Sequence, residues 1–352
     1  MTKTIRIFLC LLLLISPSAA FAFETDQFNL PTAPLADIGA EVTEYTRENI
    51  GQVMDKINAE IKTRQNCLDD AAAKNCEPAN RNRERLNYLR SNAAVERGVF
   101  RRLGAGFPPF TASGSWMESH QFTAQPARYK TSRQESIYAV FPSNYFTISE
   151  TVNLYGAQFG TDKIAHIFQQ GYTYLRIYER ASAKGLSKDA AVKKACDWGR
   201  SSERTYYGNL VSGVYSNADL AANFAGFKFY QNLTGEILIG GTIKPPIFVP
   251  ENGAWKFNEA IDLSESLLKP FVTNHLNEAL NSSIYTKFFG LRNSVRAHVK
   301  NRACAEWRNA YPASSKADFE NNSTVLRTWF GEEYGFTANA SFITIANTCF
   351  DG

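Results

Sequence analysis

The stretch SNADLAANFAGFKFYQN, which occupies residues 216–232, decides the fold. Between residues 220 and 230 nearly every side chain is apolar on all sides of a helix, and a helix of this kind is buried. The exceptions are Asp219, Asn223 and Gly226, whose i, i+4, i+7 spacing puts them on one face. Because an unpaired polar group costs several kcal/mol in a core, this face must meet polar partners. The stretch therefore predicts a central helix beside a polar site.

A second interpretation of the same residues stays open. Ser216 and Asp219 have the spacing of a helix capping box, which would give Asp219 a purely structural role. Asn223 would then make ordinary hydrogen bonds within the core. The two interpretations differ only in whether the polar face meets a functional site or other structural groups.

Two more helices are predicted upstream, at residues 161–183 and 187–201. In the first, Asp162 and His166 are four residues apart, so both project from one face and could share a ligand or a metal. A polar face is also what any amphipathic surface helix shows. In the second, Glu203 falls on the apolar side if the helix continues that far, and a buried carboxylate is normally paired or bound to a metal.

Together these side chains suggest a reaction centre. One imidazole with two or three carboxylates suits Zn, Mn or Fe with open positions for water, and such a centre could hydrolyse an ester, a phosphoester or an amide. Without a metal, the imidazole could act as a general base beside a carboxylate. The expected metal ligands are Asp162, His166, Glu203 and Asp219. The expected catalytic groups are His166 and Glu203, and the expected substrate-binding residues are Lys163, Asn223 and Tyr206.

The order of these motifs resembles the VanZ-like family and related short, uncharacterised bacterial envelope proteins. The resemblance covers about 65 residues and is carried by Asp162, Lys163, His166, Glu203, Ser216, Asp219, Leu220, Asn223 and Gly226. The chain departs from that pattern at Tyr206, where the family tends to have Gln, and in lacking the membrane spans of most members. What the resemblance implies is an envelope role, linked in some members to glycopeptide resistance.

The rest of the chain predicts a mainly α fold, a multi-helix bundle with a small β-hairpin and a long, partly β connection. Helices over residues 35–62 and 80–103 form an N-terminal hairpin within residues 23–103. Residues 104–158, rich in Gly, Pro, Ser and aromatics, form the connection. Residues 159–352 form a helical core, in which Asn252-Gly253 indicates a β-hairpin near 246–257.

Further helices are expected in this core at about residues 263–281, 285–302 and 316–329. His275 and Glu278 are three residues apart on the first of them, a spacing used by carboxylate-bridged metal sites. An ordinary polar helix face explains this pair equally well.

The first 22 residues are typical of a cleaved secretory signal peptide. Lys3 and Arg6 precede an apolar run at residues 7–15, and Ala20 and Ala22 supply the small residues of a cleavage site. The apolar run is far shorter than the ~20 residues of a membrane-spanning helix, and no later segment is apolar enough to span. We therefore expect a soluble periplasmic or secreted protein.

Composition and cysteine content agree with export. The chain has 352 residues, with 38 Lys and Arg against 34 Asp and Glu, so it is neither disordered nor basic enough to indicate nucleic-acid binding. In an oxidising compartment, Cys67 is expected to pair with Cys76, and Cys304 with Cys349, which would clip down the C-terminal tail. Cys196 is then left over and is expected to be buried.

Two functions follow from these patterns. The first is a metal-dependent hydrolase that acts on an envelope glycan, lipid or protein. The second is a non-catalytic envelope binding or structural protein that uses the same polar residues for helix packing.

Overall fold

The computed structural model describes residues 24–70, 76–106, 111–140, 148–205, 207–210, 212–287 and 290–350. The predicted signal peptide and Tyr206 lie outside the described residues. Helices dominate, and the few strands form small antiparallel sheets of two or three strands. The mainly α class is therefore confirmed. No helix in the described ranges combines the length and apolar character that crossing a membrane requires.

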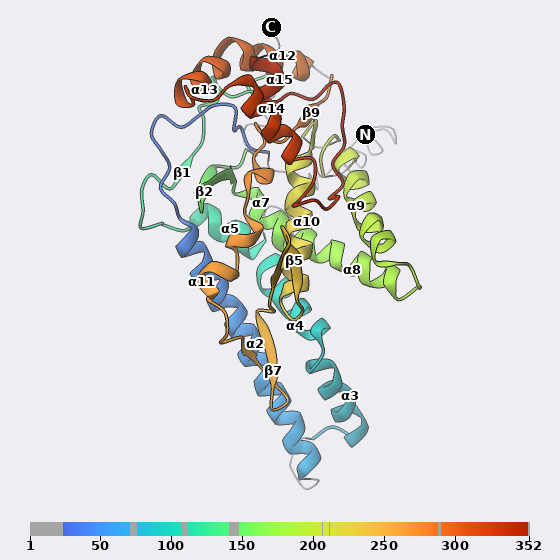
Figure 1. Ribbon diagram of the computed structural model, residues 1–352. Helices are drawn as coiled ribbons and strands as arrows, with labels where there is room; N and C mark the ends of the chain where they lie inside the picture. The colour runs from blue at the N-terminus through green and yellow to red at the C-terminus, as the bar shows by residue number, and fades with distance from the viewer. Residues whose placement is uncertain are drawn as a thin grey trace, which may run out of the picture.

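Helix α10 (Asn217–Asn232) lies at the centre of the fold (Figure 1). Every residue of α10 except Gln231 is buried, as its apolar run predicts. Around it lie the helical segments α7 (Asp162–Ala165), η2 (His166–Gln170), α8 (Gly171–Ser182) and α9 (Lys188–Arg204). The first three are consecutive, and η2 is a π-helical turn that begins at His166. Such turns are frequent at functional sites.

Two glycines let α10 cross this helical run with backbone against backbone. A Cβ atom at Gly226 would lie 2.1 Å from the carbonyl oxygen of Ile167. A Cβ atom at Gly171 would lie 2.4 Å from the carbonyl carbon of Gly226. Only glycine fits at either position, and the close crossing brings the polar face of α10 onto the start of η2.

The N-terminal helices form an arm that extends from this centre (Figure 1). The arm begins with the long α2 (Gly39–Asp69) and returns through α3 (Ala79–Leu89), α4 (Asn92–Val99) and the π-helical segment η1 (Phe100–Gly104). The predicted disulfide between Cys67 and Cys76 joins the far end of α2 to the chain that leads into α3.

A hairpin of strands β7 (Phe248–Glu251) and β8 (Ala254–Phe257) lies against α2. Its turn is Asn252-Gly253, with φ angles of 50° and 78°, which this dipeptide adopts readily. Trp255 anchors the hairpin to the arm because its indole N–H donates to the carbonyl oxygen of Leu89 at 3.0 Å.

The connection between the arm and the central helices contains helix α5 (Ala112–Ser119) and an antiparallel sheet. The strands follow the order β1 (Arg128–Tyr129), β2 (Thr151–Leu154) and β3 (Ala157–Gly160). Strand β3 leads directly into α7, so the expected division after residue 158 falls inside a strand.

The helix predicted over residues 263–281 is wrong. This region contains only the short α11 (Leu263–Ser266) and the 3₁₀ turns η3 (Lys269–Phe271) and η4 (Asn274–Leu276). Pro270 cannot donate within a helix and disfavours helical geometry in the residue before it. Farther along, the Asn277 side chain accepts from the backbone N–H groups of residues 279 and 280, which replaces helical bonds with local ones.

Two further pairs of strands complete the sheets. Strand β4 (Val214–Ser216), just before α10, pairs with β9 (Ser283–Tyr285), and β5 (Ile237–Ile239) pairs with β6 (Thr242–Lys244). The β4–β9 pair holds the start of α10 beside the chain that follows η4.

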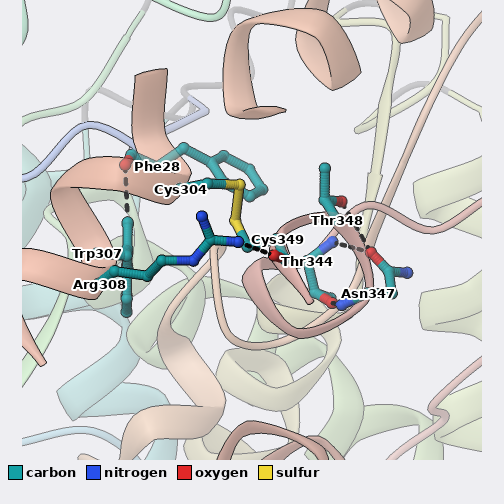
Figure 2. The surroundings of a disulfide bond; sticks show 8 residues. All are labelled: Phe28, Cys304, Trp307, Arg308, Thr344, Asn347, Thr348 and Cys349. Atoms are coloured by element: carbon teal, nitrogen blue, oxygen red, sulfur yellow. Dashed lines mark hydrogen bonds between the residues drawn. A yellow bond between two sulfur atoms is a disulfide. The ribbon is translucent and has the colours of Figure 1, made fainter. Parts of the chain in front are cut away.

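A second hydrophobic core lies under the C-terminal helices. These are α12 (Leu291–His298), the π-helical η6 (Val299–Ala303), α13 (Cys304–Ala310), α14 (Lys316–Val325) and α15 (Ile345–Cys349). Figure 2 shows the disulfide between Cys304 and Cys349, which ties α15 to α13. Both predicted disulfides are thus present, and Cys196 is a free, buried thiol.

Candidate functional site

A fully buried lysine stands at the centre of the candidate site. The Lys163 side chain has no exposed surface, and its Nζ lies 2.6 Å from Asp162 Oδ2, 2.6 Å from Asp219 Oδ1 and 2.6 Å from Glu278 Oε1. Burial alone would lower the pKa of Lys163, but Asp162, Asp219 and Glu278 outweigh it and raise that pKa well above its ordinary value. Lys163 is therefore a fixed ammonium ion surrounded by carboxylates.

Separate segments bring these four groups together. Asp162 and Lys163 begin α7, Asp219 is in the first turn of α10, and Glu278 follows η4. Burial acts to raise the pKa of Asp219, but His166 and Lys163 hold it below its ordinary value. This carboxylate is therefore ionised at neutral pH.

Hydroxyl groups satisfy the remaining oxygens of two of the carboxylates. Thr25 Oγ1 donates to Asp162 Oδ1 at 2.9 Å. Ser216 Oγ donates to Glu278 Oε1 at 2.8 Å, and Ser283 Oγ donates to Glu278 Oε2 at 2.7 Å. The same Ser216 hydroxyl accepts from the backbone N–H of Asp219 at 3.0 Å, so it caps α10 and orients the cluster at once.

His166 stands at the edge of this cluster. Its Nδ1 lies 2.9 Å from Asn223 Oδ1, and its Nε2 lies 3.6 Å from Asp219 Oδ2. The His166 side chain is 17% exposed, whereas the Asp219 side chain is 3% exposed. It is the member of the cluster that solvent or a ligand can reach, and Asn223 fixes the orientation of its ring.

The polar face of α10 therefore lies along the helical run that begins at α7. Asp219 meets Lys163 and His166, Asn223 meets His166, and Gly226 contacts the backbone of the same run. The face does meet polar partners, as the cost of burying it requires.

Two more carboxylates make the interior strongly acidic. Glu24 and Glu203 are 4% and 1% exposed. Ser212 Oγ donates to Glu24 Oε1 at 2.7 Å, whereas no side chain among the described residues donates to the Glu203 carboxylate. Burial raises the pKa of both groups well above the ordinary value, and repulsion from Asp219 adds to the effect in each. A raised pKa favours the protonated form of each group, which carries no negative charge.

This arrangement predicts a pH dependence of stability. In the unfolded chain Glu203 releases its proton above about pH 4.3. In the folded chain burial raises the pKa of Glu203, so the proton is released only at higher pH. The free energy of unfolding therefore falls as the pH rises toward the folded pKa. Glu203→Gln removes this titration, and we expect a flatter decline and a variant more stable than the parent near pH 8. Urea unfolding between about pH 5 and 9 measures both slopes.

The matched control is Glu259→Gln, because the Glu259 side chain is 83% exposed. It should leave the slope unchanged. A Glu203→Gln variant with the parent slope would contradict a raised pKa of the buried Glu203.

The structure brings some of the predicted site residues together and leaves others apart. Ligand atoms of Asp162, His166 and Asp219 lie within 4.8 Å of one another, so these three could hold one metal ion. Glu203 is not part of this group. Lys163, expected to bind substrate, is enclosed by carboxylates and has no exposed surface. Tyr206 lies outside the described residues.

Sequence reasoning missed the role of Glu278 and did not single out Glu24. Glu278 was paired with His275 on a helix that does not form there, and His275 lies elsewhere, with Nε2 2.8 Å from the carbonyl oxygen of Thr328. The spacing from His275 was the signal that marked Glu278, and no signal marked Glu24. Cys196 has a pKa raised to about 12 by burial, which makes it a poor nucleophile.

No protein-family model, curated protein or solved structure matches the chain. The function must therefore be inferred from the chemistry of its own residues.

Proposed function

We propose that the protein is an exported hydrolase of a cell-envelope component, with His166 as its central catalytic group. The observation that supports this most directly is the position of His166. It is the partly exposed member of a cluster that is otherwise almost fully buried, and Asp219 and Asn223 face its two ring nitrogens. An imidazole oriented in this way and open on one side can meet a substrate.

The chemistry follows from the two neighbours. When Nδ1–H donates to Asn223 Oδ1, the Nε2 atom carries the lone pair. A water molecule that reaches Nε2 beside Asp219 Oδ2 can give up a proton to it as the water oxygen attacks an ester, phosphoester or amide. The imidazolium that results is stabilised by Asp219, which Lys163 keeps ionised. Lys163 thus acts on the reaction through Asp219 and does not touch the substrate.

A divalent metal fits the exposed edge of the same cluster. Asp162, His166 and Asp219 would hold it, and a hard nitrogen and oxygen donor set of this kind suits Zn, Mn or Fe. When bound, such an ion polarises the scissile group and lowers the pKa of water. Both Asp162 oxygens already accept bonds from Thr25 and Lys163, so binding would require Asp162 to share an oxygen.

The second candidate is a non-catalytic envelope protein in which these residues hold the central helices together. The contacts of Lys163 favour this alternative, since its ammonium group already forms ion pairs with three buried carboxylates without any ligand. The partial exposure of the His166 side chain, however, favours the hydrolase, because a role limited to packing does not require this group to reach solvent.

Export and the envelope setting remain part of the proposal. The signal-like first 22 residues and the two disulfides support an oxidising compartment outside the cytoplasm. The resemblance to the VanZ-like family points to the same location. An envelope glycan, lipid or protein is the proposed substrate or partner.

His166→Ala tests the proposal. We expect loss of hydrolysis by a factor of about 10² or more on a panel of ester, phosphoester and amide substrates, because general base catalysis is worth that much. If a metal takes part, elemental analysis of the purified protein should show less of it in the variant. The free energy of unfolding should fall by about 1–3 kcal/mol, because the buried Asn223 loses its partner, so activity is compared under conditions in which both proteins are folded.

His120→Ala is the control, because His120 has a similar surface position, with a side chain 33% exposed and a carboxylate partner in Glu41. Equal activity and equal metal content in the parent and both variants would refute the hydrolase and favour the structural alternative.

A further inference from the structure

A second site is visible away from His166, in a cleft of about 240 Å³ between the N-terminal segment, strands β2 and β3, η4 and helices α13 and α14. Among the residues that the structure describes, none that lines it is charged, whereas each of the other three cavities described contains both acidic and basic side chains. Six lining residues carry carboxamides: Gln27, Asn29, Gln158, Asn274, Asn277 and Asn322.

The floor of the cleft is fixed by amides that are already engaged. Gln27 Nε2 donates to the carbonyl oxygen of Gln158 at 3.1 Å, and Gln27 Oε1 accepts from the backbone N–H of Glu278 at 2.7 Å. Asn277 Nδ2 donates to the same Gln158 carbonyl at 2.9 Å. These bonds hold the backbone and the buried amides in place before any ligand arrives.

The walls carry amides that are free to bind. The side chains of Gln158, Asn274 and Asn322 form no hydrogen bond to any residue that the structure describes. Asn274 and Asn322 are exposed, and Gln158 is half-buried. Each offers two N–H donors and one carbonyl acceptor.

An aromatic ring completes the cleft. Tyr311 is 41% exposed and stacks on Trp307, with ring centroids 5.2 Å apart and an angle of 28° between the planes. Trp307 is itself held by a hydrogen bond from its indole N–H to the carbonyl oxygen of Phe28 at 2.9 Å (Figure 2). The Tyr311 ring is therefore a platform with a rigid backing.

We propose that this cleft binds an uncharged saccharide, with one sugar ring placed against Tyr311. Carboxamides match hydroxyl groups because both donate and accept, and an aromatic face packs on the apolar C–H face of a sugar ring. Phosphate or carboxylate ligands would require cationic side chains, and no described residue of the lining supplies one. The volume lies below the ~300 Å³ of sites for drug-sized ligands, so the cleft holds a short part of a glycan.

This proposal is independent of the hydrolytic one, because the residues that face His166 do not line the cleft. A hydrogen bond nevertheless connects the two sites. Gln27 in the cleft floor accepts from the backbone of Glu278, whose carboxylate contacts Lys163.

The test is calorimetric titration of the full mature chain with two uncharged trisaccharides, N,N′,N″-triacetylchitotriose and maltotriose, and with the charged trigalacturonate. We expect at least one uncharged sugar to bind with a Kd on the order of 1 mM or tighter, and trigalacturonate not to bind. Tyr311→Ala should weaken binding about tenfold, which corresponds to about 1.4 kcal/mol for the lost ring contact.

Three variants keep the result interpretable. Tyr311→Phe retains the ring and should bind within about threefold of the parent. Phe330→Ala removes an aromatic residue that is 45% exposed outside the cleft, and should bind like the parent. His166→Ala should also bind like the parent, which separates this site from the hydrolytic one. No binding of either uncharged sugar, equal binding of trigalacturonate, or an unchanged Kd in Tyr311→Ala would overturn the proposal.

Discussion

Lys163→Met is expected to lower the free energy of unfolding by about 3–5 kcal/mol, the cost of removing one partner from a buried ion pair. The Lys163 ammonium lies 2.6 Å from three carboxylates that are almost completely buried. Methionine fills much of the same space but leaves those carboxylates to repel one another in a medium of low dielectric. Equilibrium unfolding in urea near pH 7 measures the loss.

The control is Lys193→Met, which removes an ion pair of a different kind. Lys193 lies 2.8 Å from Asp197 on α9, but its side chain is 67% exposed. An exposed pair of this type is worth about 0.3–0.5 kcal/mol. If Lys163→Met were no more destabilising than Lys193→Met, Lys163 would not be the charge that holds the central helices together.

The Lys163 result also bears on function. Since Lys163 helps to keep Asp219 ionised beside His166, a variant that still folds should lose the proposed hydrolytic activity together with stability. A folded but inactive Lys163→Met protein would therefore agree with the proposed reaction centre. A folded and fully active one would show that Asp219 does not need its ammonium partner.

Gly226→Ala is the second change with a large expected effect. The added Cβ would lie 2.1 Å from the carbonyl oxygen of Ile167, a distance that only movement of the backbone can relieve. Overpacking a well-packed core costs about 1–3 kcal/mol and occasionally more, and we expect the upper end of that range because the clash is with backbone. Thermal and urea unfolding would show the loss.

Gly51→Ala is the matched control. Gly51 also lies within a helix, α2, but a Cβ there would meet only the Phe257 ring at 3.6 Å, which is an ordinary contact. Replacing a helical glycine by alanine is then worth up to about 1 kcal/mol of added stability. If both alanine variants were equally stable, the close crossing of α10 over η2 would not be what fixes the helix packing.

Local sequence was enough for several elements of the fold. The burial of α10 follows from its apolar run, and the β7–β8 turn occurs at Asn252-Gly253, where a positive φ is easily adopted. The predicted helix over residues 263–281 does not form, because Pro270 and the local bonds of the Asn277 side chain interrupt it.

Some residues of the candidate site could likewise be predicted from local sequence, and others could not. Asp162 and His166, and Asp219 and Asn223, were found because i, i+4 spacing on a helix places two side chains on one face. Helical spacing gave Glu278 the wrong partner, His275, and did not mark Glu24 at all, since both glutamates lie in irregular chain. Lys163 was noticed but assigned to substrate, because nothing in its neighbours indicates that three carboxylates would surround it.

By itself, then, the sequence determined the mainly α class, the buried central helix, the two disulfides and the helical half of the polar cluster. These features depend on residues close together in the chain or on a regular period. Only the tertiary structure decided which charges meet, because Lys163, Asp219 and Glu278 are brought within 2.6 Å contacts by segments more than 50 residues apart. Burial then decided their chemistry. It enclosed the lysine, raised the pKa of Glu203 and left His166 as the partly exposed member of the cluster.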